Sequence, residues 1–351
     1  MKKITVNASK KYDVLIGNNL LKKAGEICSN YIGACKAAII TDSNVAPLYL
    51  NTLEDSLVSS GYTVTSLVFD AGEKSKNANT LIDILNFLAD SEITRSDCIF
   101  ALGGGVVGDI SGFAASIFLR GIKFVQIPTT LLAAVDSSVG GKTAIDLGDK
   151  KNIVGAFHQP SLVICDCSLQ DTLTDDIFYD GCAEVIKYGA INDRPLFDLL
   201  SDGFKENIEE IVFSCVDNKR RIVEEDEFDT GKRQLLNFGH TIGHAIEKCS
   251  AFKISHGSAV AIGMVIVTRA AHKCGFCDKK ALDDLISILK KAELPTTCEF
   301  NSKELVEVAF SDKKRMGNSI TLVIPYAIGD CRLYTLPISE LECFIEKGLS
   351  S

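Results

Sequence analysis

The chain has 351 residues, with 37 Lys and Arg against 46 Asp and Glu, and its formal net charge is −9. This length suits two domains or one large one, and the composition of 46% hydrophobic and 24% charged residues is typical of a soluble globular protein. The acidic balance excludes a general nucleic-acid binder, which needs a basic surface. A local cluster of Lys and Arg can still bind a small anionic substrate.

The sequence predicts neither membrane insertion nor export. The longest apolar stretch, from about Ala259 to Val267, is about half of what a bilayer span needs. The basic start, Met1 to Val6, has no apolar run or cleavage site behind it and alternates like a β-strand. The 13 cysteines are odd in number and scattered through apolar segments, as buried thiols are. We therefore expect a protein of the reducing cytoplasm, with no membrane and no nucleic-acid partner.

In chain order, the first half predicts strands that alternate with helices. Strands are expected at residues 36–41, 63–69, 98–102 and 124–128, and helices near residues 48–59, 78–90 and 110–118. Short apolar strands separated by helices form a parallel sheet that is covered on both faces.

After about residue 170, helices dominate the prediction. They are expected at residues 176–191, 206–227, 234–249, 256–274 and 279–292, with one late strand at residues 319–324. The predicted fold class is therefore α/β plus α. A Rossmann-like parallel-sheet domain covers residues 1–168, and a mostly helical domain covers residues 169–351.

The strongest local motif is a glycine-rich turn. Gly103, Gly105 and Gly108 match G-x-G-x-x-G directly after a predicted strand. Such glycines let the backbone approach a pyrophosphate, whose charge a helix N-terminus favours. The motif is not in the first βα turn and no acidic strand end follows about 20 residues later, but Asp42 ends an earlier strand, where it can bind a ribose. A tight turn without a ligand is the alternative.

The histidines predict a metal site. Three of the five fall within seventeen residues: His240 and His244 share one helical face, and His256 begins the next helix. Imidazoles on facing helices suit Zn²⁺ or a similar ion, and a catalytic site needs three protein ligands. Glu184 is the best candidate for a carboxylate ligand, because its helix is otherwise apolar. Hydrogen-bonded core histidines are the alternative.

Isolated cations lie in polar or glycine-rich loops along the chain. They are Lys142, Lys150, Lys151, Lys219, Arg233, Lys313 and Lys314. Each alone is most simply a solvated surface residue. Together they offer enough positive charge to hold a phosphate and a carboxylate.

In combination, these motifs resemble those of the 3-dehydroquinate synthase family, in the sugar-phosphate cyclase superfamily. The matching segments run from Asp42 to about Gly329 and include residues 72–76, 103–109, 128–130, 136–143, 183–187, 236–244 and 312–314. The resemblance implies conversion of 3-deoxy-D-arabino-heptulosonate 7-phosphate to 3-dehydroquinate and phosphate, with NAD and a divalent metal, Zn²⁺ or Co²⁺. It implies a carbon–oxygen lyase of the shikimate pathway, which supplies chorismate and aromatic amino acids, and it implies a homodimer.

The resemblance also implies roles for individual residues. The metal ligands are Glu184, His240 and His256, and the first domain binds NAD. The dinucleotide positions are Asp42, Glu73, Lys76, Gly103, Gly104, Gly105, Val106, Val107, Asp109, Thr129, Thr130, Asp136, Lys142 and Lys151. The substrate positions are Arg120, Asp136, Lys142, Asn152, Lys187, Lys219, Arg233, Asn237, His244, Lys313 and Lys314. The residues expected to act in catalysis are Lys142, Glu184, Lys187, Lys219, Arg233, Asn237, His240, His244 and His256.

Other functions compete with this one. Another cyclase, such as 2-epi-5-epi-valiolone synthase or 2-deoxy-scyllo-inosose synthase, would differ in its phosphate and carboxylate pocket, whereas this chain keeps Asn237, His244 and residues 312–314. A metal-dependent alcohol dehydrogenase, such as glycerol dehydrogenase, would need fewer cations and would produce NADH. A catalytically silent NAD-binding protein would have lost some metal ligands. One departure from the family pattern is Asp146, which stands where Asn is common.

Overall fold

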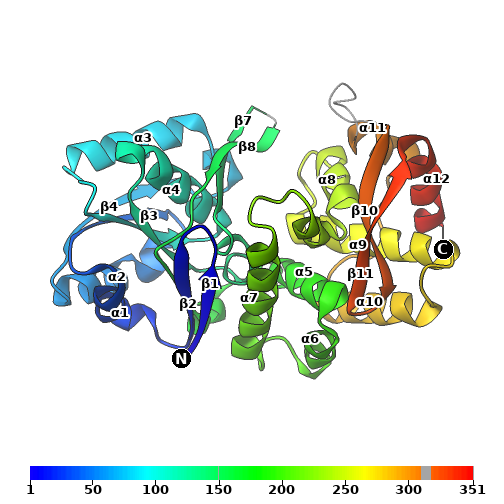
Figure 1. Cartoon of the computed structure of the whole chain (residues 1–351), viewed down its shortest axis with the longest axis horizontal. Coiled ribbons are helices and arrows are strands. Elements are labelled where there is room, and N and C mark those ends of the chain that lie inside the picture. Colours follow the sequence, from blue (N-terminus) through cyan, green and yellow to red (C-terminus); the bar gives the residue numbers. More distant parts are fainter. Residues whose placement is uncertain (149, 310–317, 351) are drawn as a thin grey trace. The chain divides into compact units, whose positions relative to one another are not determined.

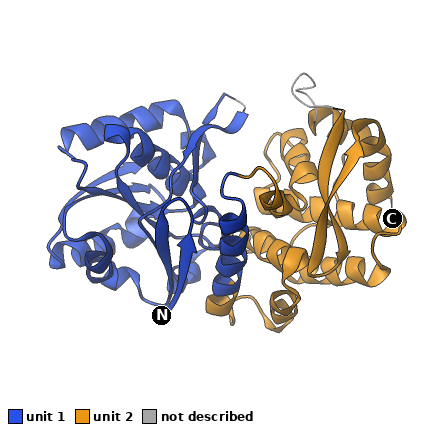
Figure 2. Cartoon of the chain, viewed as in Figure 1, with its two compact units in different colours: residues 1–173, 212–228 blue, residues 174–211, 229–351 orange. Residues whose placement is uncertain are grey.

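The computed structural model describes residues 1–148, 150–309 and 318–350. The chain divides into two compact units (Figure 2). Unit 1 comprises Met1–Leu173 and Val212–Phe228, and unit 2 comprises Thr174–Ile211 and Asp229–Ser351. The chain thus passes between the units three times. The predicted domain division between residues 168 and 169 stays a prediction.

Unit 1 is built on a seven-stranded sheet (Figure 1). Its strands are β1 (Lys2–Asn7), β2 (Lys11–Gly17), β3 (Lys36–Asp42), β4 (Thr63–Phe69), β5 (Cys98–Gly103), β6 (Lys123–Pro128) and β9 (Leu162–Asp166). The order across the sheet is β1-β2-β9-β6-β5-β3-β4. Only the β1–β2 pair at one edge is antiparallel. The predicted parallel-sheet α/β fold is therefore confirmed.

Helices cover both faces of this sheet. They are α1 (Ala24–Ile32), α2 (Ala46–Ser59), α3 (Ala78–Asp90) and α4 (Gly105–Ile117), and most of α7 (Ile208–Glu225) also belongs to unit 1. Successive side chains of β3 point to opposite faces, so Ile39 joins the core under α1 and α2, while Ile40 joins the core under α3 and α4. Asn77 starts α3, because its side chain accepts hydrogen bonds from two backbone amides of the first turn.

Unit 2 is mostly helical. Its helices are α5 (Asp175–Asn192), α6 (Arg194–Leu199), α8 (His240–Cys249), α9 (His256–Lys273), α10 (Lys279–Lys291), α11 (Ser302–Ala309) and α12 (Ile338–Leu349), and β10 (Ser319–Ala327) pairs with β11 (Asp330–Pro337). Helix α9 contacts α5, α8, α10 and α12. The α8–α9 approach is close, because a Cβ on Gly263 would lie 2.1 Å from the carbonyl oxygen of Gly239.

Several predicted boundaries are wrong. The predicted helix at 234–249 starts only at His240, because Lys232–Asn237 form a 3₁₀ turn, η7, and Gly239 has a left-handed φ of 78°. Helix α4 starts at Gly105 rather than residue 110. The late strand has a partner, β11, and the hairpin of β7 (Lys142–Leu147) and β8 (Lys150–Phe157) was not predicted.

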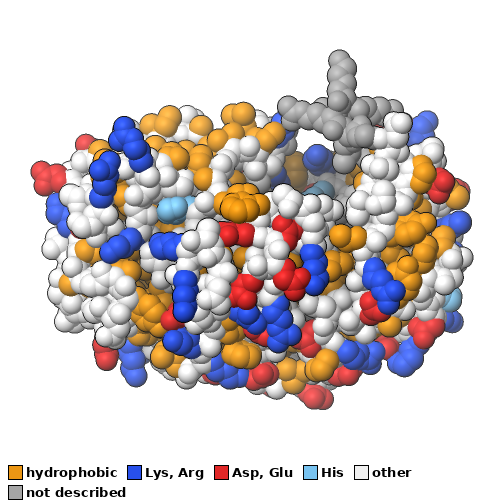
Figure 3. Space-filling view, viewed as in Figure 1, with side chains coloured by type: hydrophobic (Ala, Val, Ile, Leu, Met, Phe, Trp, Pro, Cys, Tyr) orange, Lys and Arg blue, Asp and Glu red, His pale blue; other side chains and the backbone are white. Residues whose placement is uncertain are grey.

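Two surface properties bear on the predicted partners. Among the described residues, no helix combines the length and the apolar character that crossing a bilayer requires. On the face drawn in Figure 3, side chains of both charges are interspersed.

Candidate active site

One group of predicted site residues lies at the carboxyl ends of the parallel strands in unit 1. The sheet order places β4 on one side of β3 and β5 on the other. The side on which successive strands are added therefore changes at β3, and the gap between β3 and β5 is a topological switch point. Open α/β sheets bind ligands at such a point. Asp42 is the last residue of β3 and Gly103 the last of β5. The predicted dinucleotide residues at these two strand ends therefore share one edge.

The glycine-rich turn connects β5 to α4. A Cβ on Gly103 would lie 2.5 Å from the Val107 side chain, and one on Gly108 would lie 2.9 Å from Gln126. Internal packing thus accounts for these two glycines. Gly104 and Gly105 are less crowded, and they stand at the N-terminus of α4, where backbone N–H groups favour an anion.

Some buried hydroxyl groups of unit 1 have no hydrogen-bond partner among the described residues. They include Thr41 Oγ1, Ser111 Oγ and Thr129 Oγ1. Thr129 directly follows β6, and its amide donates to the Gly103 carbonyl at 3.0 Å. Buried polar groups normally find a partner, and a polar ligand at this edge can supply one to Thr129.

Lys76 brings together three predicted site residues. Its ammonium is buried, lies 2.6 Å from Asp109 Oδ2 and donates to Asn152 Oδ1. Burial lowers the pKa of Lys76, but the charges of Asp109 and Glu73 outweigh this effect and raise it. Asp146 accepts a 2.7 Å hydrogen bond from the Asn152 amide, so this departure from the family pattern has a structural role in the β7–β8 hairpin.

Helix α7 brings a distant cation to unit 1. The buried Lys219 ammonium donates to the Asp136 carbonyl at 2.7 Å and forms an ion pair with the Asp136 carboxylate. Asp136 lies in a π-helical turn, Ala133–Ser137, shortly after Thr130. Two predicted substrate residues from separate parts of the sequence therefore meet.

The remaining predicted positions of unit 1 are mostly exposed. Glu73, Arg120, Lys142 and Lys151 are exposed, whereas Val107 is buried inside α4 and Val106 is partly buried. Arg120 lies in a short turn, Phe118–Arg120, with a φ of 71°.

A separate group of predicted site residues lies in unit 2, around Glu184. This carboxylate is 1% exposed in the middle of α5, and its Oε1 lies 3.2 Å from His240 Nε2 and 3.3 Å from His256 Nε2. Its Oε2 pairs with the equally buried Lys187. One ligand atom from each of Glu184, His240 and His256 lies within 4.8 Å of the other two. Two imidazoles and one carboxylate are the donors that a catalytic zinc site uses.

The carboxylates of Glu184 and Glu247 favour a positive charge beside them, at the imidazole of His256. Burial raises the pKa of Glu184, but Lys187 and the two imidazoles outweigh it and hold the pKa well below its usual range. Burial lowers the pKa of His256, but the hydrogen bonds and charges of Glu184 and Glu247 raise it to about 10. A proton on His256 or a metal cation can supply this charge.

Each histidine has a second contact. His240 Nδ1 lies 3.1 Å from the Phe238 carbonyl, and His256 Nδ1 lies 3.6 Å from Glu247 Oε2. His244 is not part of the cluster of Glu184, His240 and His256. Its Nε2 lies 4.0 Å from Glu247 Oε2, and its side chain is 57% exposed. Glu247 is a buried acid on α8 that was not predicted.

Unit 2 holds further predicted residues. Arg233 is buried in η7, which packs against α5, and Asn237 is exposed at the end of η7. His244 borders a cavity of about 250 Å³ that residues of α8 and α11 also line. Lys313 and Lys314 lie outside the described residues.

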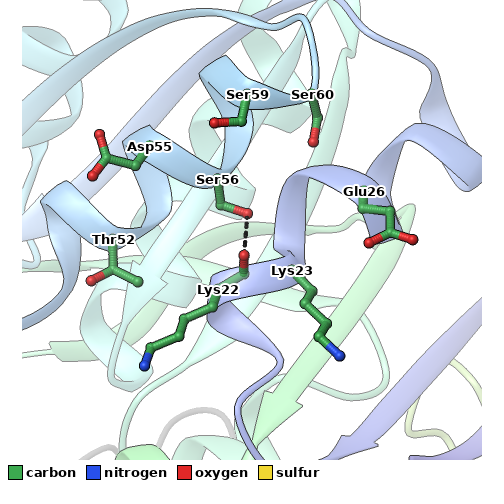
Figure 4. Close-up of a pocket in the computed structure, with 8 residues that line it drawn as sticks. All are labelled: Lys22, Lys23, Glu26, Thr52, Asp55, Ser56, Ser59 and Ser60. Carbon is green, nitrogen blue, oxygen red and sulfur yellow. Dashed lines mark hydrogen bonds between the residues drawn. The ribbon is translucent and has the colours of Figure 1, made fainter.

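A larger cavity of about 440 Å³ lies elsewhere, between α2 and the start of α1 (Figure 4). Its lining residues are Lys22, Lys23, Glu26, Thr52, Asp55, Ser56, Ser59 and Ser60. None of them is a predicted site residue, and two acids balance the two lysines.

Solved structures share this fold. A 2-epi-5-epi-valiolone synthase from Streptomyces hygroscopicus with NAD⁺ and Zn²⁺ bound aligns with a TM-score of 0.88 and 25% identity, over 99% of both chains. A 2-deoxy-scyllo-inosose synthase complexed with carbaglucose-6-phosphate, NAD⁺ and Co²⁺ aligns with a TM-score of 0.88 and 23% identity, over 99% of this chain and all of that one.

Relatives found from the sequence share a higher identity with this chain than these two structures do. The 3-dehydroquinate synthase of Clostridium acetobutylicum is 45% identical over 328 residues, which cover 91% of this chain and 92% of the relative. Family models described as the N-terminal and C-terminal parts of 3-dehydroquinate synthase match residues 66–180 and 181–315. The chain belongs to the 3-dehydroquinate synthase family.

Proposed function

We propose that the chain converts 3-deoxy-D-arabino-heptulosonate 7-phosphate to 3-dehydroquinate and phosphate, as a carbon–oxygen lyase. The observation that carries this proposal is the cluster of the buried Glu184 with His240 and His256 in a member of this family. Such a cluster in unit 2 and a dinucleotide-type sheet edge in unit 1 are the parts that the reaction requires.

The proposed metal ligands fit a divalent ion. Their nitrogen and oxygen atoms suit Zn²⁺ and Co²⁺, and three protein ligands leave coordination positions for substrate. When bound, the metal would lower the pKa of coordinated substrate hydroxyls, and NAD would take up a hydride and return it, so that no net redox change results. Glu184 would contribute one negative charge, which Lys187 partly balances.

The proposed dinucleotide site is the sheet edge of unit 1. Gly104 and Gly105 would place backbone N–H groups against the pyrophosphate, Asp42 would face a ribose, and Thr129 would donate its unpartnered hydroxyl to the ligand. The other predicted dinucleotide residues belong to the same proposal: Glu73, Lys76, Gly103, Val106, Val107, Asp109, Thr130, Asp136, Lys142 and Lys151.

Cationic and polar side chains are proposed to hold the substrate. Lys187, Lys219 and Arg233 are buried, so their charges are weakly screened and can bind phosphate and carboxylate strongly. Arg120, Asp136, Lys142, Asn152, Asn237, His244, Lys313 and Lys314 complete the proposed set. These residues would orient the substrate and select it over neutral sugars.

Two further expectations belong to this proposal. A homodimer is expected, in which the exposed Arg120 reaches the partner's site. A cytoplasmic location is expected because all thirteen cysteines lie among the described residues and none of them forms a disulfide. Light scattering that gives a monomer at micromolar concentration would contradict the dimer.

The test is a phosphate-release assay with NAD⁺ and either Zn²⁺ or Co²⁺. We expect release of inorganic phosphate from the heptulosonate phosphate without accumulation of NADH. Stoichiometric NADH would instead identify a dehydrogenase. A heptulose 7-phosphate that lacks the carboxylate is the matched control, and preferential turnover of that sugar would identify a cyclase of the valiolone synthase type. His256→Ala should abolish turnover and lower the amount of bound metal.

A further inference from the structure

The two histidines of the cluster are held in different ways. Both direct Nε2 at Glu184 Oε1, at 3.2 Å for His240 and 3.3 Å for His256. The other ring nitrogen of His240 contacts the backbone carbonyl of Phe238, two residues before it. The other ring nitrogen of His256 faces the Glu247 carboxylate from a different helix.

The contact of the ring nitrogen that faces away from Glu184 decides which nitrogen of the ring can bind a metal. A neutral imidazole carries one N–H, and the remaining nitrogen offers the lone pair. An acceptor beside Nδ1 keeps the proton there, fixes the ring and leaves Nε2 for the metal. The chain supplies this acceptor to His240 through its own backbone, whereas His256 depends on a side chain.

Glu247 is well placed to be that acceptor. It is 4% exposed and lies on α8, seven residues after His240 and therefore on the same face of the helix. Its Oε2 is 3.6 Å from His256 Nδ1 and 4.0 Å from His244 Nε2. Removing the Glu247 carboxylate from water costs free energy, which its contacts with the two imidazoles offset.

We propose that Glu247 is the positioning residue of the metal site. It keeps the proton of His256 on Nδ1 and the Nε2 lone pair directed at the ion, and it does not bind the ion itself. This inference rests on the proposed function only through the metal site that Glu184, His240 and His256 form. The competing role is that of a ligand, because His244, Glu247 and His256 also form a group that could hold an ion.

The experiment measures the affinity of Co²⁺ and Zn²⁺ by chelator competition, and the visible spectrum of the Co²⁺ protein. We expect Glu247→Leu, which removes the acceptor at similar size, to weaken binding about 10- to 100-fold. Glu247→Gln should weaken it less, because the amide oxygen can still accept from Nδ1. Both variants should shift the Co²⁺ spectrum. Glu340→Gln, an exposed acid at the start of α12, is the control and should match the wild type.

Four outcomes separate the possibilities. In a His256→Ala background, Glu247→Gln should have no further effect on affinity, because its target is gone. Wild-type affinity and spectrum in both Glu247 variants would overturn the positioning role, as would a second bound equivalent of Co²⁺ that Glu247→Leu alone removes. If the wild type binds no metal, the proposed metal site itself fails. Melting curves of the metal-free proteins show whether each variant folds, and Glu247→Gln serves if Glu247→Leu does not.

Discussion

Asp180 and Glu184 lie one turn apart on α5, and both contact the start of α9. Asp180 Oδ1 accepts hydrogen bonds from the Ser255 hydroxyl and, at 3.1 Å, from the Ser258 amide, so it fixes the backbone on both sides of His256. Glu184 contacts the ring of His256. One helix therefore positions both the backbone and the imidazole of a proposed ligand.

Asp180→Ala should reduce both stability and metal binding. The substitution removes a cap from the first turn of α9, which costs about 1 kcal/mol in comparable cases. Because His256 is the first residue of α9, its ring should also lose its fixed position. Urea denaturation and Zn²⁺ titration measure the two effects. Ser255→Ala, which removes the hydroxyl contact but leaves the Ser258 amide bonded, should be milder, and equal effects of the two variants would contradict this account.

Lys76→Met should destabilise unit 1 by about 3 kcal/mol, because it leaves the Asp109 carboxylate without its ammonium partner. Asp109→Asn removes the charge that needs compensation. The double variant should therefore lose less stability than the sum of the two single losses. Urea denaturation of the four proteins provides the cycle, and strict additivity would contradict a direct interaction.

Asp97 gives a prediction for pH. Burial raises the pKa of Asp97, but hydrogen bonds from the Thr94 side chain and amide and from the Lys36 amide hold it below its ordinary value of 3.8. Because folding lowers the pKa of Asp97, its ionised carboxylate stabilises the folded state. This contribution is complete above pH 3.8 and is lost as the pH falls through the pKa of the folded state.

Asp97→Asn should therefore cost about 1 to 3 kcal/mol near neutral pH, because one oxygen acceptor is lost. The difference in unfolding free energy from the wild type should narrow below about pH 4. Urea denaturation across this range measures it, and a difference that grows in acid would show that the sign is wrong.

Metal removal should lower stability. Zn²⁺ at 100 times its dissociation constant stabilises a folded protein that alone binds it by about 2.7 kcal/mol. Thermal melts with Zn²⁺ and with a chelator should differ in the wild type and coincide in His240→Ala. An equal response of both proteins to Zn²⁺ would contradict the assignment of His240 as a ligand.

The parallel sheet could be predicted because its strands are short apolar runs that are buried on both faces, as β5 is along its whole length. The same reasoning missed β8, whose side chains are exposed along nearly all of the strand and whose apolar residues do not alternate regularly with polar ones. It also placed the start of α8 too early, because the 3₁₀ turn before Gly239 continues the helical spacing of apolar residues.

The candidate site shows a similar division. Glu184 could be predicted because residues 181–191 around it are apolar apart from Lys187, and the resemblance to the family separated His256 from His244. Glu247 was missed because Lys248 follows it, and a charged pair on a helix looks like a solvated face. The contact of Lys219 with Asp136 joins residues 83 positions apart, and no local pattern encodes it.

The membership of α7 in unit 1 has a consequence for how the protein can be divided. The segment Val212–Phe228 follows a stretch of unit 2 in the chain but packs with the first 173 residues. A fragment that ends at Leu173 would lack Lys219, and with it the ammonium that contacts Asp136. During synthesis, unit 1 has all its residues only after Phe228 has been added, when the first part of unit 2 has already been made.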